Sequence, residues 1–212
     1  MNINEIATAA HGLKKIGKPE LFGMVRALIA SDAPVDRTAA IALYNYFTPP
    51  MPKVAKTATD WVMKALADVS DVRYHLQSAH SDGKYLTATC GHRIHRIPTT
   101  LEPGYYDRNL IKVDIDARYP DTDQFYSERG NEQEIQVFVN NLDIVEIAAR
   151  MRAYLIPVSG DMVIGVNTQY LDKARNGVND ILLTVLDETS PIRMDTEFGT
   201  AVIMPLRLPK GV

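Results

Sequence analysis

The sequence predicts an α+β fold, in which a small helical segment precedes a domain of short helices on antiparallel sheets. Apolar residues recur at helical spacing through the first 48 residues, whereas most segments after residue 70 alternate apolar with polar residues. Short helices set among runs of strands are typical of this fold class. Three prolines in residues 48–52 separate the two patterns, because proline does not fit a helix interior. We therefore expect a helical segment over 1–48, a proline-rich linker over 49–56 and a main domain over 57–212.

Composition limits the classes of protein to which the chain can belong. The 212 residues are 46% hydrophobic and 23% charged, which is ordinary for a globular protein large enough to bury a core. No apolar run approaches the roughly 20 residues of a membrane span, and no secretory signal opens the chain. Cys90 is the single cysteine, which suits a reducing compartment. We expect a cytoplasmic protein without membrane contact, whose net charge of −3 leaves only local patches for DNA.

The helical segment and the first half of the main domain follow from local signals. Gly17 ends a first helical stripe, Pro19 opens a second, and a third begins near Pro34. In the main domain we expect a short helix capped by Thr57 or Thr59. Its apolar stripe is Trp61, Val62, Ala65, Leu66 and Val69. The expected elements that follow are a strand over 72–80, a turn at Asp82-Gly83, strands over 85–90 and 110–117, and a connector over 118–131.

The second half of the main domain is expected to return to strands after one longer helix. That helix runs from Asn141 to residue 155, between strands over 134–139 and 162–166. A second helix over 168–176 ends at Gly177. Three strands complete the chain, over 180–187, 191–198 and 200–208. Because proline cannot donate to a ladder, Pro205 places the last strand at a sheet edge or turns it outward.

Several stretches resemble the bacterial sliding clamp, the beta subunit of DNA polymerase III, and occur in the order of that family. VRYHL (72–76) and ATCGHRI (88–94) are similar to middle-domain strands that carry the family motif ATDGHRL. ARYPD (117–121) resembles the GRFPD connector between the middle and last domains. Resemblance to the end of the last domain comes from MVIGVNTQYLDKARN (162–176), ILLTVLDETSPIRM (181–194) and VIMPLRL (202–208). Together, the stretches that resemble the family extend over residues 57–208.

The chain also departs from the family. A family protomer has three domains, whereas this chain holds enough residues for roughly one, so the resemblance implies a shortened clamp-like protein. Cys90 stands where the family has aspartate, and residues 1–48 have no counterpart.

The resemblance implies a peptide-binding pocket between the middle-domain hairpin and the last strand. In the family, DNA polymerase and other replication proteins insert a short motif that ends in hydrophobic residues. By resemblance, the pocket residues are Leu76, Thr89, Gly91, His92, Arg93, Ile94, Pro120, Gln124, Phe125, Val202, Ile203, Met204, Pro205 and Leu206. An apolar groove with a polar rim can hold an extended peptide. Without the resemblance, VIMPLRL is a plain core strand, and His92 and Arg93 cap a strand end beside Asp71 or Asp121.

The family also encircles duplex DNA as a ring of six domains, so one domain per chain requires a homo-oligomer larger than the bacterial dimer. Cations that could face phosphates are Lys64, Arg150, Arg152, Lys173 and Arg175. They are sparse and offset by acidic neighbours. The alternative is a clamp mimic that sequesters or recruits replication partners without encircling DNA. A third possibility, a helical DNA-binding unit fused to a clamp-like scaffold, depends on Lys14, Lys15 and Lys18.

Metal, cofactor and enzyme sites are not expected. Cys90 and His92 share a strand face, but His95 lies three residues on and points to the opposite side. No second ligand pair has metal-like spacing. The paired carboxylates Asp114 and Asp116 lie on a face that is expected to be solvated. No catalytic triad, nucleophile elbow or phosphate loop occurs in the sequence.

Overall fold

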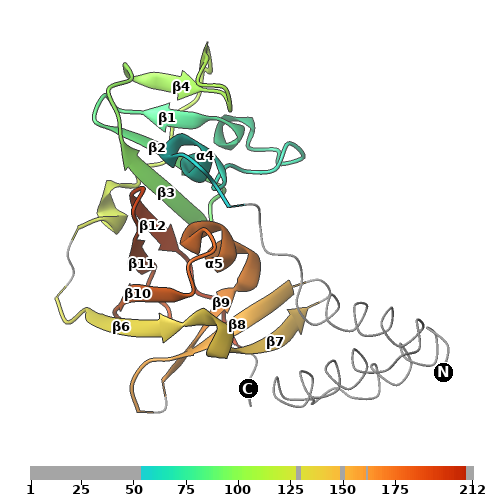
Figure 1. Ribbon diagram of the computed structural model, residues 1–212. Helices are drawn as coiled ribbons and strands as arrows, with labels where there is room; N and C mark the ends of the chain where they lie inside the picture. Colours follow the sequence, from blue (N-terminus) through green and yellow to red (C-terminus); the bar gives the residue numbers. More distant parts are fainter. Residues whose placement is uncertain (1–53, 128–129, 149–150, 161, 209–212) are drawn as a thin grey trace, which may run out of the picture. The chain divides into compact units, whose positions relative to one another are not determined.

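The computed structural model describes residues 54–127, 130–148, 151–160 and 162–208 (Figure 1). The expected helical segment over 1–48 lies outside these residues. Two α-helices are described, α4 (Ala58–Met63) and α5 (Thr168–Arg175), with short 3-10 helices η1 (Tyr74–Gln77), η2 (Asp123–Phe125) and η3 (Val139–Asn141). Within the described ranges, none of the helices has the length and apolar character that crossing a membrane requires.

Within the described residues, twelve strands form two antiparallel sheets (Figure 1). They are β1 (Ala79–Ser81), β2 (Tyr85–Thr89), β3 (Arg93–Pro98), β4 (Gly104–Tyr106), β5 (Lys112–Val113), β6 (Gln133–Phe138), β7 (Asp143–Ala148), β8 (Met151–Pro157), β9 (Val163–Asn167), β10 (Asp180–Val185), β11 (Ile192–Asp195) and β12 (Thr200–Ile203). The larger sheet has the order β5-β4-β1-β2-β3-β12-β11-β10-β6, and the smaller has the order β7-β8-β9. Short helices on antiparallel sheets confirm the α+β class.

The elements with strong local signals form where the sequence predicts them. Thr57 caps α4, because its hydroxyl accepts a hydrogen bond from the Asp60 amide at 3.0 Å. Asn167 caps α5 in the same way, and the helix ends at Asn176 in the left-handed conformation (φ 50°). Between β1 and β2, the Asp82 carboxylate accepts from the amides of Lys84 and Tyr85, both at 2.7 Å. The expected hairpin is therefore present.

Two expected strands are shorter than the alternation suggests. Residues 72–80 were predicted as one strand, but the chain forms η1 there and pairs only from β1 onward. Leu76 is buried while Val72 is 93% exposed, because the Leu76 amide donates to the Arg73 carbonyl and closes a turn instead of a ladder. The strand expected over 110–117 is reduced to β5. Val69, predicted in the stripe of the first helix, lies beyond its end and is exposed.

The helix expected from Asn141 to residue 155 is wrong. This segment forms β7 and β8, which pair with each other, and β8 also pairs with β9 from Ala153 to Pro157. The branched side chains of Ile144 and Val145 favour a strand over a helix. Pairing with β9, which lies later in the chain, supplies the backbone hydrogen bonds that decide the outcome.

Trp61 and His95 join both helices to the larger sheet. The two rings stack with centroids 4.2 Å apart, and His95 Nδ1 lies 2.9 Å from the Trp61 carbonyl oxygen. The Trp61 indole donates to the Ala174 carbonyl of α5 at 2.7 Å. Ala55, which falls within the expected linker, is buried and exchanges hydrogen bonds with Asn176. The helices therefore cover one face of β2, β3 and β12.

The last strand lies inside the larger sheet, between β3 and β11, so its predicted edge position is wrong. The predicted outward turn at Pro205 agrees with the structure. Strand β12 ends at Ile203, and the Met204 amide then donates to the His92 carbonyl at 2.9 Å. After Pro205, the Leu206 amide donates to the Gly165 carbonyl at 2.7 Å, so the chain crosses to the smaller sheet.

Candidate functional site

Three neighbouring strands supply the floor of a pocket on the face opposite the helices. Thr89 of β2 is paired with Ile94 of β3, and Ile94 is paired with Val202 of β12. Their chain neighbours His95 and Ala201 are also paired, and both are fully buried in the core. Because side chains alternate across a strand, the row that contains His95 and Ala201 packs under the helices. The next row, Thr89, Ile94 and Val202, forms the floor of the pocket.

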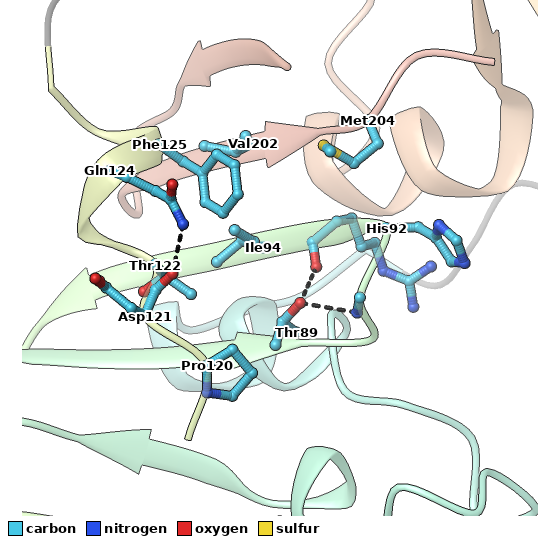
Figure 2. Close-up of a pocket in the computed structure, with 12 residues that line it drawn as sticks. Thr89, His92, Ile94, Pro120, Asp121, Thr122, Gln124, Phe125, Val202 and Met204 are labelled. Carbon is cyan, nitrogen blue, oxygen red and sulfur yellow. Dashed lines mark hydrogen bonds between the residues drawn. The ribbon is translucent and has the colours of Figure 1, made fainter. Parts of the chain in front are cut away.

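The turn between β2 and β3 closes one end of the pocket. Thr89 holds it, since its hydroxyl donates to the Arg93 carbonyl at 2.8 Å and accepts from the Gly91 amide at 2.9 Å (Figure 2). Gly91 has a φ of 88°, and a Cβ there would lie 2.5 Å from Arg73 Nη1. The positive φ favours glycine at this turn, whereas the Arg73 side chain is flexible and could move away from a Cβ. The hydrogen bond from Met204 to His92 ties the same turn to the end of β12.

The connector that contains η2 forms the wall of the pocket, and Arg96 of β3 fastens it to the sheet. Arg96 Nη2 lies 2.9 Å from the Thr122 hydroxyl oxygen and 2.6 Å from an oxygen of the Asp123 carboxylate. Its guanidinium carbon also lies 3.9 Å from the centre of the Tyr126 ring. The Tyr119 hydroxyl donates to the Thr87 carbonyl at 3.0 Å, and burial raises the pKa of Tyr119 and of Tyr126. The wall is therefore fixed to the sheet by two part-buried hydrogen bonds and one exposed ion pair.

These parts enclose a pocket of about 380 Å³. Ten of the fourteen predicted pocket residues line it, namely Thr89, Gly91, His92, Arg93, Ile94, Pro120, Gln124, Phe125, Val202 and Met204. Figure 2 shows their arrangement around the floor strands. Aliphatic, aromatic and thioether groups on the floor, with hydroxyl and amide groups around them, suit a ligand with apolar anchors and an accessible backbone.

Four predicted residues do not line the pocket. Leu76 is buried in η1, and Ile203 is fully buried in the core because it points to the opposite face from Val202. Pro205 and Leu206 lie on the segment that has left the sheet toward Gly165.

The prediction also missed two residues of the wall, Asp121 and Thr122. They lie between Pro120 and Gln124 in the sequence, so the predicted connector already contained the signal for them.

The cations predicted to face DNA have different surroundings among the residues that the structure describes. Arg175 has 3% of its side chain exposed, binds Asp172 at 2.8 Å and donates to the Val178 carbonyl, so it cannot serve as a phosphate contact. Lys64 donates to the Asn176 side chain at 2.7 Å. Burial lowers the pKa of Lys173. Arg152 lies in β8, and Arg150 lies outside the described residues.

The histidines and the cysteine of the hairpin are dispersed. His92 stacks parallel to Tyr170 with centroids 6.1 Å apart, whereas His95 is in the core. Among the side chains that the structure describes, no three His, Cys, Asp or Glu residues are grouped in a way that could hold a metal ion.

No protein-family model and no curated protein matches the sequence. Solved structures with a similar fold include the DNA polymerase III beta subunit of Thermotoga maritima, at TM-score 0.52 and 14% identity, covering 76% of this chain and 69% of that one. The sliding clamp of Bartonella birtlesii, bound to griselimycin, is similar at TM-score 0.51 and 16% identity, covering 71% and 63%. The clamp of Bacillus subtilis is similar at TM-score 0.50 and 13% identity, covering 78% and 68%. The main domain therefore has the fold of the bacterial sliding clamp, the beta subunit of DNA polymerase III.

Proposed function

We propose that this chain is a clamp-like protein of DNA replication that binds short peptide motifs of replication proteins in the pocket of Figure 2. One observation supports this function above all others. Residues from three separate stretches, 89–94, 120–125 and 202–204, line a single pocket, and these stretches are the ones that resemble the peptide pocket of the clamp family. The partners would be DNA polymerase or other replication proteins.

The pocket is suited to binding and does not require a chemical step. Ile94 and Val202 give the floor an apolar surface, while Phe125 and Met204 are only partly buried and can contact a ligand side chain. Met204 is flexible and polarizable, so it can adapt to anchors of different shape. The Bartonella clamp with this fold binds griselimycin, which supports a ligand site in this fold. We therefore propose a non-enzymatic, cytoplasmic binding protein without metal or cofactor.

The second candidate function is peptide binding without encirclement of DNA, and the charge of the chain favours it. The chain has a net charge of −3, Arg175 is buried in an ion pair, and Lys64 is bound to Asn176. Few phosphates could be neutralised by this set, so binding to duplex DNA would be weak and sensitive to salt. A clamp mimic that sequesters or recruits replication partners fits these observations. The other candidate is a homo-oligomer that closes into a ring around duplex DNA.

Peptide titration tests the pocket. We expect a fluorescent peptide with a Leu-Phe anchor to bind the full chain with a Kd on the order of 1 μM, which corresponds to about −8 kcal/mol. Phe125→Ala combined with Met204→Ala should weaken binding at least about tenfold, because the side chains that can contact the anchor are removed. Phe138→Ala is the matched control, since Phe138 is half exposed on β6 and does not line the pocket. Equal affinity of the double variant and the wild type would contradict the assignment.

Retention on DNA separates the two candidate functions. A closed ring would stay on circular duplex at high salt and slip off once the circle is cut. A clamp mimic would be lost from both forms of DNA as salt rises, because only exposed cations contribute. Measuring the oligomeric mass in solution on the same samples tests the expected homo-oligomer.

A further inference from the structure

A second cavity opens where strands β10 and β11 separate. Strand β10 pairs with β6 from Asp180 to Val185, whereas among the described residues it pairs with β11 only at Thr184 and Arg193. Beyond that pair, residues of both strands, of the end of α5 and of the turn that follows β11 enclose a cavity of about 360 Å³. We call this cavity the β10–β11 pocket.

The β10–β11 pocket presents apolar side chains to solvent. Val178 is 48% exposed and Leu182 is 43% exposed, and both line the pocket together with the buried Ile181 and Met194. Large apolar groups that are exposed around a hollow can be covered by a ligand, and covering them is favourable because apolar area leaves water. The pocket therefore has a surface suited to an aliphatic group.

Carboxylates surround these apolar groups. Asp180, Asp195 and Glu197 line the pocket and are exposed, and none of the ion pairs among the described residues includes them. Asp195 accepts a hydrogen bond from the Thr200 hydroxyl at 2.6 Å, which does not neutralise its charge. Arg175, the cation in this lining, is bound to the carboxylate of Asp172. The rim of the pocket is therefore negative.

The arrangement of these carboxylates limits the class of ligand. Among the side chains that the structure describes, no acidic group of this kind is close-set enough to hold a metal ion. Nucleic acid would be repelled, because its phosphates have the same sign of charge. A peptide segment with Lys or Arg on both sides of an aliphatic residue fits better. Its long cationic side chains can reach separate carboxylates, while their stems and the aliphatic residue cover the apolar groups.

The β10–β11 pocket lies near the peptide pocket on the same sheet. Val202 of the peptide-pocket floor is paired with Arg193, and Arg193 is paired with Thr184. Side chains two residues away return to the same face of a strand, which places Leu182 and Asp195 on the side of Val202. Neighbouring strands are about 4.8 Å apart, so β10 lies about 10 Å from β12, a distance that about three extended residues span.

We propose that the β10–β11 pocket is a second docking surface for the partner whose motif occupies the peptide pocket, and that it binds a basic segment of that partner. The segment has Lys or Arg beside an aliphatic residue and lies a few residues from the motif. This inference rests on the proposed function, because the motif brings the segment to its site. Once the motif is bound, the second contact forms within the complex and raises the affinity without a tight site of its own.

The test compares peptides that share a Leu-Phe anchor. A spacer of three residues joins the anchor to Lys-Leu-Lys or to Gln-Leu-Gln, and the extension precedes the anchor in one pair and follows it in the other. A peptide with the anchor alone is the reference. In fluorescence anisotropy at low salt, we expect Lys-Leu-Lys to bind the full chain about fivefold tighter than Gln-Leu-Gln in one arrangement, because exposed ion pairs contribute modestly. The gain should shrink at 1 M salt, where the screening length is about 3 Å.

Variants locate the gain. Asp195→Asn combined with Glu197→Gln should abolish it, and Asn keeps an oxygen that can accept from the Thr200 hydroxyl. The control is Asp143→Asn combined with Glu188→Gln, which removes the same charge from exposed residues outside both pockets. Leu182→Gln should weaken both extended peptides and leave the anchor-only peptide unchanged.

The outcomes separate this inference from the proposed function. If the anchor-only peptide does not bind, the proposed function fails, and binding of Lys-Leu-Lys that the acidic double variant abolishes would support the second surface alone. Absence of binding by every peptide would overturn both. If the anchor binds and Lys-Leu-Lys gives no gain in either arrangement, the peptide pocket stands and the second surface is wrong. Equal gains in the acidic double variant and its control would also overturn the inference, because the net charge of the chain would then be the cause.

Discussion

Acidification should destabilise the main domain through His95. This side chain is fully buried, stacks on Trp61, and has no partner for its Nε2 among the described atoms. Burial is the main cause that lowers the pKa of His95 from 6.5 to about 3. The folded state therefore keeps a neutral imidazole at pH values where the unfolded chain binds a proton. The contribution to stability is complete above the unfolded pKa of 6.5 and is lost progressively as the pH falls toward 3.

The size of this effect follows from the two pKa values. Between pH 7 and pH 5, proton binding by the unfolded imidazole should lower the free energy of unfolding by about 1.9 kcal/mol, with a limiting slope of about 1.4 kcal/mol per pH unit. This pH range lies mostly above the titration of ordinary carboxylates. His80, whose pKa is also lowered by burial, adds a loss in the same direction. A variant of His95 is therefore needed to isolate its share.

Urea unfolding, followed by the fluorescence of the single tryptophan, measures the effect in the full chain. His95→Phe retains an aromatic ring against Trp61 and removes the titrating group. We expect the wild type to lose about 1.9 kcal/mol more than His95→Phe between pH 7 and pH 5. Equal losses in the two proteins would show that His95 is not buried in its neutral form, and would refute the stacked arrangement of α4 on β3.

Two further substitutions test the parts that shape the pocket. Arg96→Ala should detach the wall and weaken peptide binding about tenfold in a fluorescence anisotropy titration, because a charge-assisted contact is lost. Lys112→Ala, which removes an exposed ion pair at the far end of the sheet, should have no effect, and equal losses in the two variants would contradict this role. Gly91→Ala should lower the free energy of unfolding by about 1–3 kcal/mol, because the turn holds this residue at a positive φ that strains an alanine. Gly130→Ala is the control for thermal denaturation, since a Cβ there meets no atom within 4 Å, and similar melting temperatures for both variants would be the contrary result.

Sequence was sufficient where a structure is set by neighbouring residues. The Thr57 cap, the end of α5 beside Gly177 (φ 89°) and the Asp82 turn each involve hydrogen bonds or dihedral angles within a few residues, so local chemistry predicts them. The segment from Asp143 to Pro157 is different. Its apolar residues fit a helical stripe, but its partner β9 lies beyond it in the chain, and periodicity contains no information about that partner.

In the candidate site, too, local features could be predicted from the sequence, whereas features that depend on distant segments could not. Motif order located three stretches that line the pocket, but it could not indicate which side of each strand faces that pocket. Alternation within β12 separates Val202, on the floor, from Ile203, in the core. That signal was present in the sequence and would have corrected the prediction. The role of Arg96 could not be predicted, because it depends on how the connector folds back over β3.

Strand β12 has a consequence for how ligand preference can change during evolution. Its two faces have different roles, since Ala201 and Ile203 fill the core while Val202 lies in the floor of the pocket. Most substitutions in this strand would reduce the yield of folded protein before any change in affinity could be selected. Gln124 and Phe125 of the connector are only partly covered, so their side chains can vary with little effect on folding. We therefore expect substitutions in the wall to change which partners bind, because substitutions in the floor are limited by their effect on folding.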